Sequence, residues 1–443
     1  MTETELSTEP QEQDQQETPP PRPQETVSLQ DLHKLSHAEL LQRANDLGIR
    51  PRLNSNKFHL ALDQARFHLA QDDILLAEGI LEMQGQHGHL RWEESNFKPC
   101  ADDVHLLPSL IRRYSLQPGL KVKCRVSRQL DRDRNLVADD IVTIEGEKMD
   151  AWDPNRPFDK LTPIFPNRRL VLENSGSLDI STRAVDLVAP LGMGQRGLIV
   201  APPRAGKTMM LKAIARGIRK NHPEVNLILL LVDERPEEVT DMRRELSADV
   251  FSSTFDENVS RHVQVCEMVS DRSQRLVEMG KDVVILIDSL TRMARGYNNL
   301  QPNKGRAMSG GVDSRALLKP RKFFGSARNV EEGGSLTIIA TVLVETQSRM
   351  DDLIFEEFKG TGNMELHLDR SIAEQRIFPA IQIIKSGTRR EEKLYHPDEM
   401  HRIATLRRQL AELPAIEAMT LLSKNLQATD SNAELLMRGL KGT

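Results

Sequence analysis

Leucine spacing near the N-terminus predicts helices. Apolar residues recur every three or four positions in LQDLHKLSHAELLQRANDLGI and again in NKFHLALDQARFHLAQ, and this period is typical of amphipathic helices. Ser36 lies three residues before Glu39, which is the spacing of a capping box, and Gly48 suits the end of that helix. The pattern predicts a small helical module over residues 27–74.

From residue 75 the apolar period shortens towards two. GILEMQ, HLRW, LKVKCRV and DDIVTIEG have the pattern of short strands, and glycine, proline and asparagine separate them. Residues 75–148 are therefore expected to form a small barrel or sandwich. Four prolines between Pro154 and Pro166 then predict a linker, or a loop laid over a surface, at 149–167.

The rest of the chain alternates between two patterns. GLIVA, LILLLVD, VVILIDS, SLTIIATV and FPAIQII are continuous apolar runs, as expected of strands buried on both faces. Charged stretches with helical spacing separate these runs. Residues 168–443 are therefore expected to fold as a parallel α/β domain.

Charge and composition change this picture at the N-terminus. Residues 1–26 are rich in Glu, Gln, Thr and Pro and carry seven acidic residues against one arginine, so a disordered acidic tail is expected. The other residues are close to neutral, since the whole chain has a net charge of -5. Three widely spaced cysteines suit a reducing compartment. Without a long apolar run or a secretory signal, we expect a cytoplasmic protein that has no membrane partner.

The stretch APPRAGKT at 201–208 follows an apolar run and precedes a helical pattern. Backbone N–H groups in such a loop bind phosphate oxygens, a lysine reaches the outer phosphates, and a threonine holds Mg²⁺. Ala201 stands where the usual pattern has its first glycine, but an ordinary backbone conformation suffices there. We expect ATP and Mg²⁺ to bind here. The nucleotide contacts are assigned to Pro203, Arg204, Ala205, Gly206, Lys207, Thr208 and Met209.

Two further apolar runs end in carboxylates. VVILIDS places Asp288 at the end of a predicted strand, where it would hold the metal ion, although an aspartate there could also cap the next helix. LILLLVDERPEEV ends in Asp233 and Glu234, and such a carboxylate could orient and deprotonate the attacking water. Arg235 is then close enough to sense the nucleotide or a neighbouring subunit. The other interpretation of this stretch is a solvated charged loop.

The window 301–328 contains seven basic residues and one aspartate, with Gly310 and Gly311 beside Arg306. This charge and the glycines describe a flexible basic finger that favours nucleic acid as a partner, although a solvated basic face has the same composition. Further along, IKSGTRRE offers Arg389 and Arg390. By spacing alone these two are surface arginines.

Taken together and in this order, these stretches resemble the bacterial transcription termination factor Rho family over about residues 27–443. The matching strings are RGLIVAPPRAGKT, LLLVDERPEEVTDM, DVVILIDSLTRMARGYN, SGGVDSRALLKP, FFGSARNVEEGGSLTIIATVLVET, FEEFKGTGNMELHLDR and RIFPAIQIIKSGTR. Long strings agree here, so the match is more specific than a phosphate loop alone.

The resemblance implies an α/β RecA-like P-loop ATPase domain, preceded by the helical module and an OB-like, cold-shock-like RNA-binding barrel. It also implies a homohexameric ring that loads on nascent RNA and translocates 5′ to 3′. Such a ring dislodges RNA polymerase and works with elongation factors. The activity expected is that of an RNA-dependent ATPase and RNA–DNA helicase.

The family's site residues carry over to matching positions. Lys207 and Thr208 would bind phosphate and Mg²⁺, Asp288 would be the Walker B carboxylate, and Glu234 would be the base, with Arg235 beside it. Two arginines, Arg389 as the arginine finger and Arg376, would reach the neighbouring subunit. Arg306 and Arg349 fall where the family's central-pore loops contact RNA.

The chain departs from the family in two ways. Arginine replaces the usual lysine at Arg204, Arg306 and Arg349, which keeps the charge but gives a planar group able to chelate phosphate or stack on bases. In the barrel, His87 and His89 of QHGHLRW occupy the phenylalanine positions, and His105 lies near a tyrosine position. We assign RNA contacts to these histidines and to Arg91. Histidine can stack on a base and could make loading pH-sensitive, or these are ordinary surface histidines of a barrel that has drifted.

Two other functions remain possible on the sequence alone. The first is a ring ATPase of similar core that moves DNA or works as a rotary-type subunit, and stimulation by DNA equal to that by RNA would favour the translocase version. The second is an RNA-binding scaffold whose ATPase has lapsed, which the intact set of candidate catalytic residues disfavours. The members of that set are Lys207, Thr208, Glu234, Asp288 and Arg389.

Overall fold

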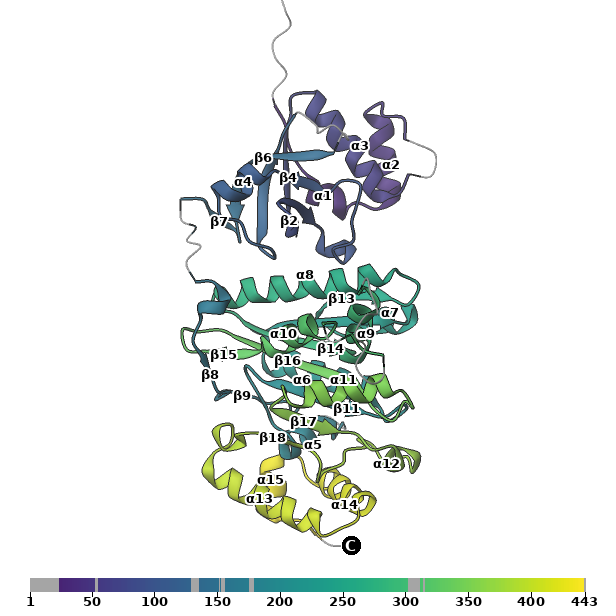
Figure 1. Ribbon diagram of the computed structural model, residues 1–443, viewed down its shortest axis with the longest axis vertical. Coiled ribbons are helices and arrows are strands. Elements are labelled where there is room, and N and C mark those ends of the chain that lie inside the picture. Colours follow the sequence, from purple (N-terminus) through teal and green to yellow (C-terminus); the bar gives the residue numbers. More distant parts are fainter. Residues whose placement is uncertain are drawn as a thin grey trace, which may run out of the picture.

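The molecule has three tiers, which Figure 1 shows from top to bottom. Helices and a barrel form the N-terminal tier, a large sheet flanked by helices forms the middle, and a group of helices forms the C-terminal end. The computed structural model describes residues 24–51, 55–128, 135–150, 152, 156–174, 179–301, 311–313 and 315–441. Of the predicted tail, residues 1–23 lie outside the described residues.

The N-terminal helices are α1 (Leu29–Lys34), α2 (His37–Asp46) and α3 (Lys57–Ala70). The capping box forms as predicted: the Glu39 N–H donates to Ser36 Oγ at 3.3 Å, and the Ser36 N–H donates to Glu39 Oε2 at 2.7 Å. Gly48 follows α2 with a φ of 72°, a left-handed conformation that suits glycine. The leucines at helical spacing, such as Leu32 and Leu40, are buried in the N-terminal core.

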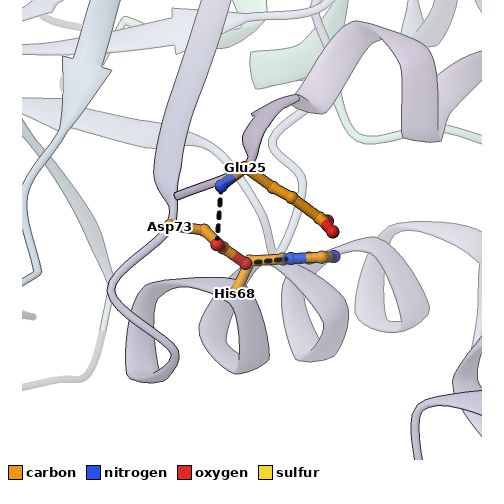
Figure 2. A group of neighbouring side chains, drawn as sticks. All are labelled: Glu25, His68 and Asp73. Atoms are coloured by element: carbon orange, nitrogen blue, oxygen red, sulfur yellow. Dashed lines mark hydrogen bonds and ion pairs between the residues drawn. The ribbon is translucent and has the colours of Figure 1, made fainter. Parts of the chain in front are cut away.

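The last residues of the segment predicted as tail are described, and Thr26 starts strand β1 (Thr26–Ser28). Figure 2 shows how this start is fastened. The buried carboxylate of Asp73 accepts a hydrogen bond from the Glu25 N–H at 3.0 Å, and its other oxygen lies 2.8 Å from Nδ1 of the buried His68. One carboxylate thus joins the entry to β1 to the end of α3.

A closed barrel follows, built from β2 (Ile74–Gln84), β3 (His87–Arg91), β4 (Val104–Leu106), β5 (Lys121–Val126) and β6 (Leu136–Ile144). The strand order is β2-β3-β4-β6-β5, and β5 returns to pair with β2. Within it, β4 and β6 are parallel and the other neighbours are antiparallel. This closed five-stranded topology confirms the expected OB-like barrel. The helix α4 (Pro108–Arg113) and the short strand β7 (Glu147–Lys148) complete the tier.

Part of the predicted linker packs on the ATPase domain. Phe158, in the short 3₁₀ helix Phe158–Lys160, is buried, and the Arg328 guanidinium carbon lies 4.5 Å from the centre of its ring. Strand β8 (Pro163–Ile164) pairs with β15 (Arg328–Val330) at the edge of the large sheet. For these residues the second sequence interpretation, a loop laid over a surface, describes the structure.

The large sheet has the order β13-β12-β14-β16-β11-β17-β18, and its first six strands are parallel. Because the strands are parallel, their carboxyl ends meet along one edge. That edge carries the ends of three predicted strands: Ala201, Glu234 and Asp288. The bounds are β11 Arg196–Ala201, β12 Asn226–Glu234, β13 Asp249–Thr254, β14 Asp282–Asp288, β16 Ser335–Leu343, β17 Met364–His367 and β18 Gly387–Thr388.

Helices cover both faces of this sheet, so alternate residues of one strand enter opposite cores. Leu229 packs into the core shared with α6, whereas Ile228 packs into the core shared with α8. The first face is covered by α5 (Ser181–Val188), α6 (Lys207–Asn221) and α7 (Pro236–Glu245), with α12 (Arg370–Glu374), α13 (Pro397–Ala411), α14 (Ala415–Gln427) and α15 (Asn432–Arg438) on the same core. The second carries α8 (Val259–Glu278), α9 (Leu290–Asn299), α10 (Leu318–Gly325) and α11 (Arg349–Lys359).

Two details differ from the sequence predictions. The run FPAIQII at 378–384 is not a strand: it is an irregular segment whose one ladder contact is the bridge between Ile381 and Leu368. Ile381 and Ile383 are buried in the core while Phe378 and Ile384 are exposed, so burial alone explains the apolar composition of this run. In contrast, β13 was not predicted, because its sequence DVFSST is too polar to stand out.

Helix α8 lies along the junction between the barrel and the sheet (Figure 1). Arg272 on α8 contacts Glu145 at 2.5 Å, and the rings of Phe97 and Phe251 stack across the junction with centres 4.5 Å apart. Gly119 approaches α8 so closely that a Cβ there would lie 2.3 Å from the Asp271 carbonyl carbon. The barrel is therefore docked on the ATPase domain through buried, close contacts.

Candidate nucleotide and RNA sites

The predicted phosphate loop connects β11 to α6. Ala201 ends β11 with its side chain fully buried, paired with Leu343 of β16, and its φ is not in the left-handed region. The loop instead turns at Arg204, with φ 66°, and at Gly206, with φ 91°, which is the N-cap of α6. The interpretation that alanine suffices at position 201 is therefore confirmed. Pro203, Arg204 and Met209 are exposed and Ala205 is buried.

Lys207 and Asp288 meet at the carboxyl edge of the sheet. The Lys207 ammonium donates to Asp288 Oδ1, and the Thr341 hydroxyl donates to the same oxygen at 2.9 Å. Asp288 is buried, and Thr208 follows Lys207 in the first turn of α6. The residues assigned to phosphate and metal are thus brought together, and the lysine is paired to the carboxylate.

Glu234 ends β12 beside this pair and is the candidate base. Its side chain is buried, and Oε2 has no hydrogen-bond partner among the residues that the structure describes. Burial, followed by the charge of Asp288, raises the pKa of Glu234. A buried carboxylate with a raised pKa and one free oxygen is suited to accept a proton from water. Arg235, next in sequence, is exposed and lies 3.5 Å from Glu238.

Arg292 on α9 is a residue that sequence reasoning missed. Its guanidinium donates to the Asp233 carbonyl and lies 3.7 Å from Glu234 Oε1. Asp233 itself has a φ of 55° and lies 3.9 Å from Nε2 of His262. Arg292 follows Asp288 by four residues in the string DSLTR, and that spacing across a strand-to-helix turn is the signal that could have revealed it.

Phe378 is a second missed residue. Its ring is half exposed, and its Cε1 lies 3.7 Å from the position that a Cβ on Gly206 would occupy. Met209, in the first turn of α6, is also exposed. Both apolar side chains border the phosphate loop, where they can contact a nucleotide base. The signal in the sequence was a phenylalanine two residues after Arg376, although the run around it had been interpreted as a strand.

The two arginines assigned to the neighbouring subunit are exposed. Arg376 follows α12 with a φ of 60°, two residues before Phe378, so its segment borders the phosphate loop of its own chain. Arg389 follows β18 and lines a cavity of about 330 Å³ with Glu365, Lys385 and Arg407. In the described part of the chain, the Arg389 guanidinium makes no hydrogen bond.

The three barrel histidines form a row of rings on one face. The ring centres of His89 and His105 are 4.5 Å apart with nearly parallel planes, and those of His87 and His105 are 5.3 Å apart. His87 is exposed, whereas His89 and His105 are half-buried. Burial, with the nearby charge of Arg91, lowers the pKa of His89 to about 4. The row therefore includes a ring that stays neutral at physiological pH.

The other residues assigned to RNA differ in accessibility. Arg91 is buried beside the row and pairs with Glu82 at 2.5 Å and with Asp103. Arg349 is exposed at the start of α11. Arg306 lies outside the described residues. The structure thus offers the histidine row and Arg349 to solvent, while Arg91 supports the row from within.

Comparison with known proteins gives two family matches. Residues 181–388 match the ATP synthase alpha/beta family nucleotide-binding domain, and residues 77–150 match the Rho termination factor RNA-binding domain. Among solved structures, a prototypical type III secretion system ATPase of pathogenic bacteria aligns with a TM-score of 0.53 and 21% identity, covering 68% of this chain and 90% of that one. This likeness shows the fold alone, and together with the family match over residues 181–388 it confirms the predicted P-loop ATPase fold.

Relatives with much higher identity cover nearly the whole chain. The transcription termination factor Rho of Akkermansia muciniphila is 49% identical over 418 residues, spanning 94% of this chain and 88% of that protein. The Rho proteins of Pseudomonas aeruginosa and Bacillus subtilis are each 47% identical, over 92% and 88% of this chain and over 98% and 91% of their own lengths. The barrel, the ATPase domain and these identities together place the chain in the transcription termination factor Rho family.

Proposed function

We propose that this chain assembles into a homohexameric ring that pulls nascent RNA 5′ to 3′ and displaces RNA polymerase. As a member of the Rho family it is a transcription termination factor with RNA-dependent ATPase activity. The observation that carries the proposal is the meeting of Lys207, Asp288 and Glu234 at one sheet edge, in a chain whose barrel is of the Rho RNA-binding type. The direct test is whether ATP hydrolysis requires single-stranded RNA.

The donor atoms at the sheet edge suit Mg²⁺. The Asp288 carboxylate and the Thr208 hydroxyl are hard oxygen ligands of the kind that Mg²⁺ prefers. When bound, Mg²⁺ would neutralise the developing charge of the phosphates. Lys207, which pairs with Asp288, would exchange this contact for the outer phosphates, because both partners are anionic. The N–H groups at the start of α6 would hold the inner phosphates.

Glu234 is suited to orient and deprotonate the attacking water. Arg292 is 3.7 Å from Oε1, which leaves Oε2 as the oxygen without a partner. Arg292 also donates to the Asp233 carbonyl, so it fixes the backbone turn that carries Glu234. We assign Arg292 as a positioning residue for Glu234. The exposed Phe378 ring and Met209 would contact the adenine base.

The exposed arginines favour the assembly of subunits into a hexameric ring. An exposed guanidinium without a hydrogen-bond partner in the described structure is available to a neighbouring subunit, and Arg389 has this property. Arg389, and with it Arg376, would stabilise the charge on a γ-phosphate bound next door. Arg235 would sense the nucleotide that is bound to its own subunit. A trans-acting arginine makes hydrolysis depend on assembly.

RNA would meet the chain at two places. The histidine row would stack on bases at the barrel, and Arg349 with Arg306 would contact the RNA backbone in the central pore. Because arginine can chelate phosphate through two N–H groups, these positions favour a phosphate contact.

In the described part of the chain, no helix is both long and apolar enough to span a membrane.

Replacing His87 and His105 with alanine is expected to weaken binding of single-stranded RNA, because two rings of the row are lost. Stacking on an aromatic is worth roughly 1–3 kcal/mol per base, so a loss of at least about tenfold is expected. Phenylalanine at the same positions offers more ring area and should retain or raise the affinity. Fluorescence anisotropy with a labelled oligonucleotide measures both, and alanine variants that bind as well as wild type would contradict the role of the row.

The same row has an expected pH dependence of stability. The folded-state pKa of His89 is lowered to about 4, below its ordinary value of 6.5. Between these values the unfolded chain binds the proton and the folded barrel does not, so the free energy of unfolding falls as pH drops from about 6.5 to 4. Chemical denaturation at pH 7 and pH 5 should show this loss, and His89→Phe should reduce it.

A further inference from the structure

A cavity of about 670 Å³ lies between the barrel and the ATPase domain. Strand β2 contributes Glu82 and Gln84, the segment between β3 and β4 contributes Lys98, and α8 contributes Ser260, Arg261 and Gln264. This volume is within the range typical of sites for small ligands, about 300–1,000 Å³. Most of the lining side chains are polar, which suits a polar ligand.

The cavity continues the histidine face of the barrel. In the register of β2 and β3, Glu82 lies opposite His89 and Gln84 lies opposite His87. Side chains of directly opposed residues project from the same face of a sheet. The Glu82 carboxylate also accepts hydrogen bonds from Arg91 at 2.5 Å and from Gln264 of α8 at 2.6 Å. Glu82 is thus shared between the histidine face and the cavity wall.

Both the phosphate and the base of a nucleotide would have polar groups to contact in this cavity. The side chain of Asn258, the N-cap residue of α8, makes no capping hydrogen bond. The backbone N–H groups in the first turn of α8 can therefore donate to a phosphate. Arg261 is 8% exposed: its Nη1 donates to Gln264 Oε1 at 2.8 Å, its Nη2 donates to the Asn96 carbonyl, and its Nε, within the described structure, is buried without a hydrogen-bond partner. Arg261 therefore brings a fixed positive charge to the cavity wall. Lys98 adds an exposed ammonium, now 3.0 Å from Glu257. The oxygens of Glu82 and Gln84 can accept from the exocyclic amine of a base.

We propose that this cavity is a subsite for one nucleotide of the RNA strand that crosses the histidine row. The subsite rests on the proposed function, since it extends the barrel's RNA site. The strand leaves the row at His87 and Gln84, enters the cavity, places its base edge against Glu82 and Gln84, and places its phosphate against Arg261 and the start of α8.

The position of the subsite connects RNA to the ATPase centre. His262, the residue after Arg261, is buried and lies 3.9 Å from Asp233, whose neighbour is the candidate base Glu234. One turn of α8 therefore contacts the cavity on one side and the catalytic edge on the other. A nucleotide in the cavity would contact the same turn of α8 that lies against Asp233, the neighbour of the candidate general base Glu234.

Filling the cavity tests the proposal. Ser260 is exposed, lines the cavity and makes no hydrogen bond within the described structure, so Ser260→Trp adds bulk without removing a contact. The measurement is the affinity for a series of RNA oligonucleotides that lengthen by one nucleotide. In wild type, the nucleotide that reaches the cavity should add about tenfold in affinity, as expected for a hydrogen bond to a charged group. In Ser260→Trp this gain should disappear while the shortest oligonucleotides bind normally, and Ser260→Leu should be intermediate.

The matched control is Glu417→Trp, which places an exposed tryptophan in the first turn of α14, a helix on the other core. This control should retain the full length dependence. If Ser260→Trp also retains it with an unchanged melting temperature, the subsite is overturned while the barrel's role stands. Wild-type protein that binds none of the oligonucleotides would contradict the proposed function and the subsite together.

Discussion

Replacing Glu234 with glutamine should lower RNA-dependent ATP turnover by about 10²–10⁴-fold, which is the range for loss of a positioned general base. Glutamine has nearly the same shape, so the contact with Arg292 and the packing of β12 are retained. It cannot accept the proton of the attacking water. ATP affinity should change little, because Glu234 is not among the phosphate-contacting residues, and equilibrium binding of a fluorescent ATP analogue measures this separately.

The matched control is Glu237→Gln, an exposed glutamate in the first turn of α7, three residues away. It removes the same charge close to the site but no group at the sheet edge, and its turnover should stay within about twofold of wild type. Turnover by Glu234→Gln close to that of wild type would show that another residue activates the water, and Asp233 would be the next candidate.

Replacing Arg389 with alanine should lower turnover by about 10³–10⁵-fold, the effect typical of losing an arginine finger. Arg389 is exposed and makes no hydrogen bond within the described structure, so the variant should fold and melt like wild type. The neighbouring Arg390, which is also exposed and lies 3.7 Å from Glu392, is the matched control. Arg390→Ala should leave most of the activity.

Mixing variants shows whether Arg389 acts between subunits. Arg389→Ala and Lys207→Ala should each be inactive alone, the second because it loses the phosphate contact. In a mixed ring, an intact phosphate loop can face an intact Arg389 from its neighbour, so part of the activity should return. If the mixture stays inactive although exchange of subunits is verified, Arg389 acts within its own chain and the proposed ring mechanism is wrong.

The ATPase elements could be predicted from sequence because their signals are local. A buried strand ends, a loop or carboxylate follows, and the parallel sheet brings those ends to one edge. This is why Lys207, Asp288 and Glu234, separated by up to 81 residues, lie together as predicted. The family resemblance added the RNA partner and the OB-like barrel, which strand patterns alone had left as a barrel or a sandwich.

Other features depend on contacts that no local pattern carries. The run at 378–384 has strand-like composition, yet its apolar residues are divided between the core and the phosphate loop, so the strand prediction was wrong. Arg91 was assigned to RNA by its string, but pairing with Glu82 and Asp103 buries it. The junction along α8 joins residues more than 120 positions apart, such as Arg272 and Glu145. Such pairs become visible only once the domains are docked.

ATP hydrolysis by this chain depends on RNA if the barrel and the catalytic edge of the sheet act together. Steady-state ATP turnover should be measured with poly(C), with poly(U), with single-stranded DNA and without nucleic acid, at equal nucleotide concentration. Dependence on RNA predicts negligible turnover without nucleic acid, strong turnover with at least one RNA, and little with DNA. Equal turnover in the absence of RNA, or equal stimulation by DNA, would contradict it.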